Sequence, residues 1–226
     1  MKLVGKGASS GKIRSKIIYF GIDTKKNSPD KRDEKLREKL KIFDSPTLIS
    51  LRRFDPVYDI ETLIKAIPLV LREVSNAKFI IVGSGEQEDY LKDLAKSLGV
   101  MENIKFTGEL LSDEIPKYLA SSDVYVSTSL SDSGLAGSTG EAMACGLPVV
   151  VTDTGCNREW IKDGESGFII PVKDPDALAK KVIYLFKNNN IMKQFGKINR
   201  DTICDRQDYY TEMEKMEKIY EELSRK

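Results

Sequence analysis

The chain alternates short runs of β-branched and aromatic residues with longer stretches in which apolar residues recur at helical spacing. Because most of these runs are apolar throughout, they suit parallel strands buried on both faces of a sheet. Strand and helix repeat in turn, which predicts right-handed crossovers and a doubly wound parallel α/β sheet with helices on both faces. In such a sheet, ligands bind beyond the carboxyl ends of the strands. The runs are KIIYF (16–20), TLISL (47–51), KFIIVG (78–83), IKFTG (104–108), DVYVS (123–127), LPVVVT (147–152) and SGFIIP (166–171).

Histidine is absent from the 226 residues, and this absence excludes whole classes of site. Ser-His-Asp and Cys-His catalysis need an imidazole base, and most zinc sites need an imidazole ligand. The three cysteines lie too far apart for a C-x-x-C pair, and so sparse and odd a set fits a reducing compartment. No apolar run reaches the roughly 18 residues of a membrane span. We therefore expect a soluble, cytoplasmic protein.

Charge is balanced over the chain as a whole but not along it. The formal net charge is +1, which gives no reason to expect nucleic acid as a partner. Residues 1–41, however, carry 13 Lys and Arg against five Asp and Glu, a net charge of +8, so the other 185 residues carry −7. This basic segment is either a solvated leader or a surface for phosphate, anionic lipid or an acidic partner.

Composition divides the chain into three parts. Residues 1–16 form the basic leader, residues 17–45 a polar linker with one short helix around 32–43, and residues 46–226 the α/β domain with a C-terminal helix. An apolar stripe on that last helix predicts packing against the sheet rather than a coiled coil, because it is too short for the latter. The stripe consists of Tyr209, Met213, Met216, Tyr220 and Leu223.

Three local motifs resemble ligand sites only in part. GKGASSGKI (5–13) has the glycines of a phosphate loop out of register and an isoleucine in place of the Mg²⁺-binding hydroxyl. GSGEQE (83–88) lacks the third glycine of a dinucleotide fingerprint, which disfavours an NAD-dependent oxidoreductase. Asp174 and Asp176 have the spacing of a metal–diphosphate site, but Asp174 before Pro175 is better interpreted as a helix N-cap.

The glycine-rich segment 129–155 is the strongest local candidate for a ligand site. Gly134, Gly137 and Gly140 lead from a predicted strand into a predicted helix that contains Glu141. Free backbone N–H groups at the positive end of a helix suit a phosphate, and a carboxylate in the first helical turn can accept two hydrogen bonds from a ribose diol. The sequence from Ser138 to Glu141 is equally a capping box. The local sequence leaves both interpretations open.

The same segment, EAMACGLPVV from Glu141 onwards, resembles the C-terminal half of family-four retaining glycosyltransferases of the GT-B fold, also called glycosyl transferases group 1. Further motifs follow in the order and at the spacing of that family over roughly residues 17–190, and together they make a chance match improbable. They are FGID (20–23), LRRF (51–54), IVGSG (81–85), FTG (106–108), TG…E (154–159) and DG…GF (163–168).

The resemblance assigns roles to individual residues. Glu141 corresponds to the second glutamate of the family's Glu-x7-Glu motif, which holds the nucleotide ribose. Arg53 corresponds to the arginine that neutralises the donor diphosphate. Both are our candidates for catalytic residues. By the same resemblance the amides of the loop Gly134, Leu135, Ala136 and Gly137 face the distal phosphate and the sugar, while Gly108, Glu109 and Leu110 line the base pocket. Gly83, in the family's Gly-x-Gly turn, is a further candidate for binding the nucleotide sugar. The family generally uses no bound metal, so we expect no metal ligands and no cofactor besides the sugar nucleotide.

Two positions depart from the family's pattern. The first glutamate of Glu-x7-Glu falls at Ser133, with Asp132 beside it, and the lysine that partners the arginine falls at Tyr58. Asp132 replaces the glutamate if the chain shifts by one residue. The sequence therefore does not decide whether Asp132 or Ser133 orients the sugar. Part of the phosphate neutralisation is likewise unassigned, because Tyr58 stands in place of the lysine.

The acceptor-binding half of such an enzyme normally precedes the linker, and about sixteen residues precede it here. We expect either an excised domain, with the leader as a remnant of the other half, or a subunit that meets that half in trans. The resemblance implies the donor-binding domain of a retaining enzyme that transfers a hexose from a UDP- or GDP-sugar to an acceptor hydroxyl. The first alternative is a non-catalytic or split subunit that binds nucleotide and docks a partner, with peripheral membrane contact. The second, less favoured alternative is an NAD-dependent oxidoreductase domain.

Overall fold

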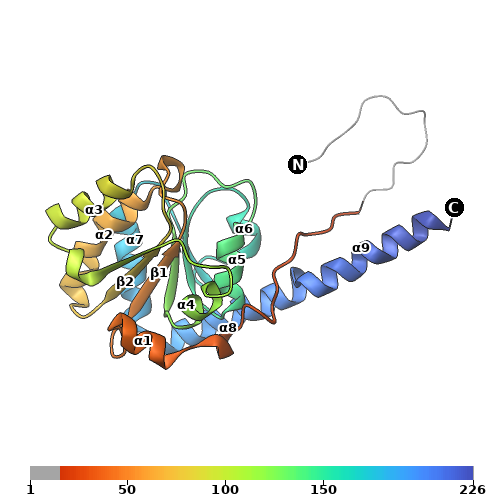
Figure 1. Cartoon of the computed structure of the whole chain (residues 1–226), viewed down its shortest axis with the longest axis horizontal. Coiled ribbons are helices and arrows are strands. Elements are labelled where there is room, and N and C mark those ends of the chain that lie inside the picture. The colour runs from red at the N-terminus through yellow and green to blue at the C-terminus, as the bar shows by residue number, and fades with distance from the viewer. Residues whose placement is uncertain (1–15, 226) are drawn as a thin grey trace.

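The computed structural model describes residues 16–225, and its centre is one parallel sheet of six strands (Figure 1). The strand order is β3-β2-β1-β4-β5-β6, so the chain first builds outward from β1 and then returns to its other side. The strands are β1 (Thr47–Leu51), β2 (Lys78–Val82), β3 (Ile104–Gly108), β4 (Val124–Ser127), β5 (Val149–Thr152) and β6 (Gly167–Ile170). The predicted doubly wound α/β fold is confirmed.

Helices cover both faces of the sheet, and two buried apolar clusters fill the space between (Figure 1). One cluster lies under α2 (Ile60–Glu73), α3 (Glu88–Ser97) and α7 (Pro175–Lys187). The other lies under α4 (Ile115–Ala120), α5 (Gly137–Ala144) and α6 (Asn157–Trp160). Helix α8 (Asn189–Arg206) contributes Phe195 to the first cluster and Ile203 to the second, and so closes the end of the domain.

Short helical pieces connect these layers, and the expected helix cap at Asp174 can be compared with the structure. The 3₁₀ turns are η1 (Pro29–Lys31), η2 (Pro56–Tyr58) and η3 (Met101–Asn103). Asp174 caps α7 as predicted, because its carboxylate accepts a hydrogen bond of 2.8 Å from the Ala177 amide. Asp59 stands at the start of α2 but bonds the Thr62 hydroxyl instead of a backbone amide.

The linker is a packed part of the domain rather than an extended tether. Its one α-helix is α1 (Glu34–Leu40), inside the predicted range 32–43. Arg37 on this helix is buried and donates hydrogen bonds to the carbonyl oxygens of Ser121 and Ile42. The linker is thereby fixed to the loop before β4.

The run at residues 16–20, predicted to be a strand, is not one. It lies along α9 (Tyr209–Ser224), where the Tyr19 amide donates a 2.8 Å hydrogen bond to Glu212, and Ile17 and Phe20 are exposed. Its only continuation into β structure is a single bridge between Ile22 and Asp208. This β-branched run therefore contacts a helix and is not part of the sheet.

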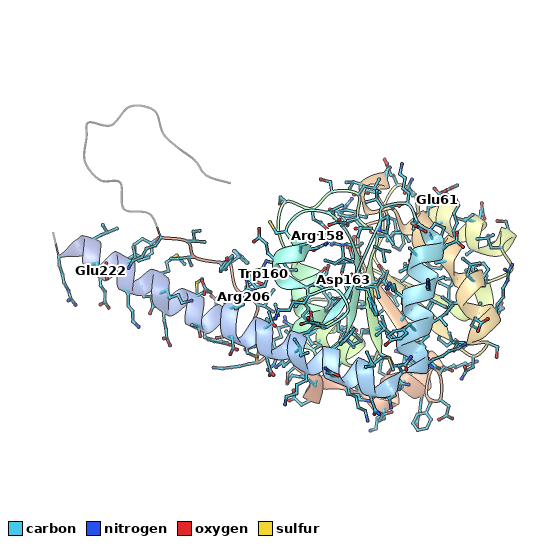
Figure 2. All side chains as sticks on the ribbon, turned by 180° about the vertical axis from the view of Figure 1, so that it is seen from behind. Glu61, Arg158, Trp160, Asp163, Arg206 and Glu222 are labelled. Atoms are coloured by element: carbon cyan, nitrogen blue, oxygen red, sulfur yellow. The ribbon has the colours of Figure 1, made fainter. Side chains whose placement is uncertain are left out.

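Helix α9 does not pack on the sheet, which corrects the prediction from its apolar stripe. It projects away from the domain (Figure 1), and Glu212 is its one buried residue. At its base the Arg206 guanidinium lies over the Trp160 ring, 4.3 Å from the centroid (Figure 2). Of the predicted leader, residues 1–15 lie outside the described residues. Within the described part of the chain, no helix is both long and apolar enough to cross a bilayer.

Candidate functional site

The candidate site lies at the carboxyl edge of the sheet, where β1 and β4 are neighbours although the chain runs outward from each in opposite directions. This point is the topological switch, at which doubly wound sheets bind their ligands. Two open pockets of about 280 Å³ and 490 Å³ lie at this edge. The loop from Glu109 to Ile115 contributes side chains to both.

The first pocket, called the arginine pocket here, lies over the ends of β1, β2 and β3. Four predicted site residues meet in it: Arg53, Gly83, Glu109 and Leu110. Ser84 joins them and donates a 2.6 Å hydrogen bond to the Glu109 carboxylate. The complete lining is Leu51, Arg52, Arg53, Val82, Gly83, Ser84, Glu109, Leu110 and Ile115.

Two consecutive arginines follow β1 and point in different directions, as neighbouring residues of an extended chain do. The Arg53 side chain is 64% exposed and is held by a 2.8 Å hydrogen bond from Nε to Asp55. That bond raises the pKa of Arg53. A planar, permanently charged group at the pocket mouth is well suited to a phosphate.

Gly83 lines the arginine pocket, and its backbone has no room for a side chain. Its φ is +138°, and a Cβ would stand 2.0 Å from the Arg52 carbonyl oxygen. Its amide donates a 2.9 Å hydrogen bond to the carbonyl of Gly108, which ends β3 behind the pocket. The backbone conformation alone explains why residue 83 is a glycine, so this glycine does not indicate a nucleotide-binding site.

The second pocket, called the glutamate pocket here, lies between the linker and the first turns of α5. Glu141 and Gly137 meet linker residues there, and Lys26 stands nearby, bonded to Ser112 at 2.7 Å and to Asp113 at 2.8 Å. Burial raises the pKa of Glu141. Its lining is Phe20, Gly21, Ile22, Asp23, Lys26, Asn27, Ser112, Gly137, Glu141 and Tyr209.

The capping-box interpretation of Ser138 and Glu141 is wrong. Helix α5 begins at Gly137, so Ser138 is already helical and Glu141 is in the second turn, beyond the reach of a cap. The Ser138 hydroxyl instead bonds the Tyr125 hydroxyl at 2.9 Å. Glu141 makes no side-chain hydrogen bond or ion pair to a residue between 16 and 225, which leaves its carboxylate available to a ligand.

The loop before α5 is open where the two candidate glycines stand. A Cβ at Gly134 or Gly137 would meet no atom within 4 Å, and neither glycine has the positive φ that would require it. Packing and backbone strain therefore do not explain these glycines, whereas close approach of a ligand to the main chain would. Leu135 packs against the apolar cluster below, and Ala136 is the N-cap residue of α5.

The departures from the family's pattern meet in one crevice between β1 and β4. Arg52 lies across it, with its Nη2 3.1 Å from the Asp132 carboxylate and its guanidinium 5.4 Å from the centre of the Tyr58 ring. Ser133, by contrast, is exposed and lines neither pocket. Gly108, Gly134, Leu135 and Ala136 also line neither pocket.

Sequence reasoning missed Arg52, Ser84 and Lys26 as site residues. Ser84 lies within the motif IVGSG and Lys26 lies three residues after FGID, so their positions gave a weak signal. Arg52 gave none, since its role depends on Asp132, 80 positions later in the chain. Among the described residues, no group of three or more Cys, Asp or Glu side chains is arranged to hold a metal ion.

The fold and the site together define a doubly wound α/β domain with open pockets at the carboxyl edge of its sheet, and comparison with known proteins gives its family. The family described as Glycosyl transferases group 1 matches residues 32–202, and this chain belongs to it. The resemblance inferred from the motifs is thereby confirmed, and the family favours a transferase over an NAD-dependent oxidoreductase.

Two curated relatives and one solved structure show how far the likeness extends. A GDP-mannose-dependent alpha-(1-6)-phosphatidylinositol monomannoside mannosyltransferase of Mycobacterium tuberculosis is 28% identical over 81% of this chain and 49% of its own. An uncharacterised glycosyltransferase of Methanocaldococcus jannaschii is 36% identical over 73% of this chain and 43% of its own. HepE of Anabaena, crystallised with UDP and glucose, is 25% identical with a TM-score of 0.81, over 92% of this chain and 57% of its own. The chain thus spans about half the length of the curated relatives it matches.

Proposed function

We propose that this chain is the donor-binding domain of a retaining glycosyltransferase that transfers a hexose from a nucleoside-diphosphate sugar to an acceptor hydroxyl. The observation that carries the proposal is the open carboxyl edge at the switch point. The mostly exposed Arg53, which is paired with Asp55, lies there with the half-buried Glu141, whose carboxylate has no partner among residues 16–225. Gly134 and Gly137, which packing does not require, lie in the loop before α5. This is the set of groups that a diphosphate flanked by a ribose and a sugar would need.

Each group has a role in the proposed reaction. Arg53 and the N-terminus of α5 stabilise the charge that develops on the leaving diphosphate. Glu141 accepts hydrogen bonds from the ribose diol, and Glu109 and Leu110 border the base. The acceptor hydroxyl attacks the face from which the diphosphate leaves, and the departing phosphate oxygen takes the hydroxyl proton. The residues therefore bind and stabilise, and none of them acts as a base. No metal is required, because cationic groups and amides carry the neutralisation.

The donor is a UDP- or GDP-sugar. Both bases have support, since the mycobacterial relative is named as GDP-mannose-dependent and the Anabaena protein was crystallised with UDP and with UDP-glucose. Calorimetric titration of the purified chain with UDP-, GDP- and ADP-glucose and with GDP-mannose tests the proposal. We expect one base to bind at least tenfold more tightly than the others. If none binds at millimolar concentration, the proposal is wrong.

Arg53 sharpens this experiment, because its predicted partner is the diphosphate and not the nucleoside. Arg53→Lys keeps the charge and removes the planar fork. We expect it to weaken UDP or GDP at least fivefold and the corresponding nucleoside less than twofold. Lys65→Met, on the exposed face of α2, removes a cation away from the site and serves as the control. Equal weakening of nucleotide and nucleoside by Arg53→Lys would falsify the phosphate assignment.

The proposal also places the protein in the cytoplasm with peripheral contact to the membrane face. Its support is the excess of 13 basic over five acidic residues in 1–41, which is attracted to anionic lipid. Co-sedimentation with phosphatidylglycerol vesicles, compared with phosphatidylcholine vesicles, tests this part. Binding that is equal for the two lipids would contradict it.

A further inference from the structure

The crevice at the switch point holds a buried arginine whose charge packing does not explain. Arg52 directly follows β1, and its Nε and Nη2 donate hydrogen bonds of 3.1 and 3.0 Å to the hydroxyl of Ser127, the last residue of β4. Its side chain is 10% exposed. Removing a guanidinium from water is costly unless an anion compensates for it. A neutral hydroxyl in this position would bind β1 to β4 without that cost.

The anion that compensates Arg52 belongs to a loop whose main chain is fixed. Asp132 is 12% exposed and makes the single ion pair of Arg52 at 3.1 Å. Its carbonyl oxygen lies so close to Gly155 that a Cβ there would stand 2.4 Å away. The backbone at Asp132 therefore has no room to move towards Gly155, and of the pair only Arg52 lines the arginine pocket. Separation of the pair thus requires rotation of the Asp132 side chain rather than a shift of its main chain.

Arg52 has donor capacity left over for a second anion. Its Nη1 makes no hydrogen bond to any residue from 16 to 225, although the rest of the guanidinium is bonded. The guanidinium also lines the arginine pocket beside Arg53 and is 5.4 Å from the Tyr58 ring centre. Tyr58 supplies a π face for the cation but no charge. Two consecutive arginines thus border the same pocket, Arg52 paired with Asp132 and the mostly exposed Arg53 paired with Asp55.

We propose that Arg52 is the second diphosphate-binding cation of this chain and that Asp132 is its resident counter-ion, which the diphosphate displaces. The inference rests on the proposed function and adds to it the replacement of Asp132 by the diphosphate as the partner of Arg52. In the empty site, Asp132 holds the guanidinium in place and compensates its charge. When a diphosphate enters, its oxygens take over the hydrogen bonds of Arg52, and the Asp132 carboxylate turns away because two anions on one guanidinium repel each other.

The exchange predicts opposite effects for the two members of the pair. Arg52→Met removes the cation, so we expect UDP or GDP and inorganic pyrophosphate to bind at least tenfold more weakly, while the nucleoside changes less than twofold. Asp132→Asn keeps the shape and removes the competing charge, so we expect the same ligands to bind at least threefold more tightly. Since Asp132→Asn leaves a buried charge uncompensated, the free energy of unfolding should fall in the same variant.

The measurement is calorimetric titration of the whole chain, with unfolding in urea for each variant. Glu73→Gln is the matched control, because it breaks the exposed ion pair to Lys187 by the same change of a carboxylate into an amide. We expect it to leave every affinity unchanged. Arg52→Lys keeps the charge without the fork and carries the test if Arg52→Met does not fold. It should weaken pyrophosphate and the nucleotide by similar factors.

Two results would overturn the inference while leaving the proposed function standing. One is a wild-type chain that binds UDP or GDP, with Asp132→Asn binding it equally or more weakly. The other is an equal loss of nucleotide and nucleoside in Arg52→Met, which would give Arg52 a structural role only. If the wild-type chain binds no sugar nucleotide, the proposed function fails by itself. Pyrophosphate then still tests the exchange, and an affinity that Asp132→Asn does not raise rejects it.

Discussion

Glu141 is the residue at which the proposed function makes its sharpest claim. It is half-buried, it borders the glutamate pocket, and it makes no side-chain hydrogen bond to any residue in 16–225. If it holds the ribose diol, Glu141→Ala should cost about 2–3 kcal/mol of nucleotide affinity, the range for a hydrogen bond to a charged group. Since it caps no helix, the free energy of unfolding should not fall. Titration and urea unfolding of one variant measure both quantities.

Asp174→Ala is the matched control for that experiment. Asp174 caps α7 through the Ala177 amide, far from the glutamate pocket, and its loss should cost about 1 kcal/mol of stability. Nucleotide affinity should stay as in the wild type. A Glu141→Ala chain that loses stability but binds nucleotide normally would reverse our assignment and return Glu141 to a structural role.

The pH dependence of stability gives a second prediction at this residue. Burial raises the pKa of Glu141 above its ordinary value of 4.5, so the fold favours the neutral carboxyl. The stability that this group contributes is therefore full below the ordinary pKa and is lost as pH rises through the raised one. We expect Glu141→Gln to be more stable than the wild type at neutral pH, with the difference shrinking towards acid pH. Urea unfolding across this range checks it, and a difference that does not vary with pH contradicts it.

Helix α9 is the element whose surroundings the sequence did not disclose. Tyr220 is 66% exposed and Leu223 is 60% exposed, so replacing either by serine should change the free energy of unfolding by less than about 0.5 kcal/mol. Ile203 on α8 is fully buried, and Ile203→Ala should cost about 2–4 kcal/mol. Urea unfolding of the three variants measures the contrast. A large loss from Leu223→Ser would show that α9 packs on the domain after all.

Local composition predicted the six strands of the sheet. It also predicted a seventh strand, in a run of the same composition that is not part of the sheet. TLISL and IKFTG became β1 and β3 without a change of bounds. KIIYF has the same β-branched character but does not enter the sheet, since Tyr19 bonds Glu212 of α9 and packs its ring against Trp160 of α6. Periodicity reports that a face is apolar and does not report which partner covers it. The same limit applies to the stripe on α9.

The candidate site could be predicted where a motif is local and not where two distant segments meet. Arg53 and Glu141 follow from short motifs, and the structure places both at the carboxyl edge of the sheet. Arg52 shares the motif of Arg53 but owes its position to Asp132, and only the folded chain brings the two together. The capping box failed for a related reason, because α5 begins two residues earlier than the motif requires.

At the scale of the whole molecule, helices cover both faces of the sheet, and the two pockets at its carboxyl edge are open. Both pockets lie on one edge of the sheet. Helix α9 projects beyond the domain (Figure 1), and the chain spans about half the length of its curated relatives. A sugar donor bound at this edge would be exposed to water on the side away from the sheet. A transferase must also place an acceptor within reach of the sugar, and the roles proposed for Glu141 and Arg53 concern the donor only.

We therefore predict that this chain alone binds the donor nucleotide but does not transfer its sugar at a useful rate. Positioning two reactants can contribute on the order of 7–11 kcal/mol to barrier reduction, and we expect that contribution to need an acceptor site as well as a donor site. A radiolabelled-donor assay with mixed acceptors, run beside the nucleotide titration, measures both properties. Transfer should appear when the acceptor-binding half of a relative is supplied in trans. Multiple turnovers by the chain alone would reject the prediction, and nucleotide binding with no transfer under either condition would favour a non-catalytic subunit.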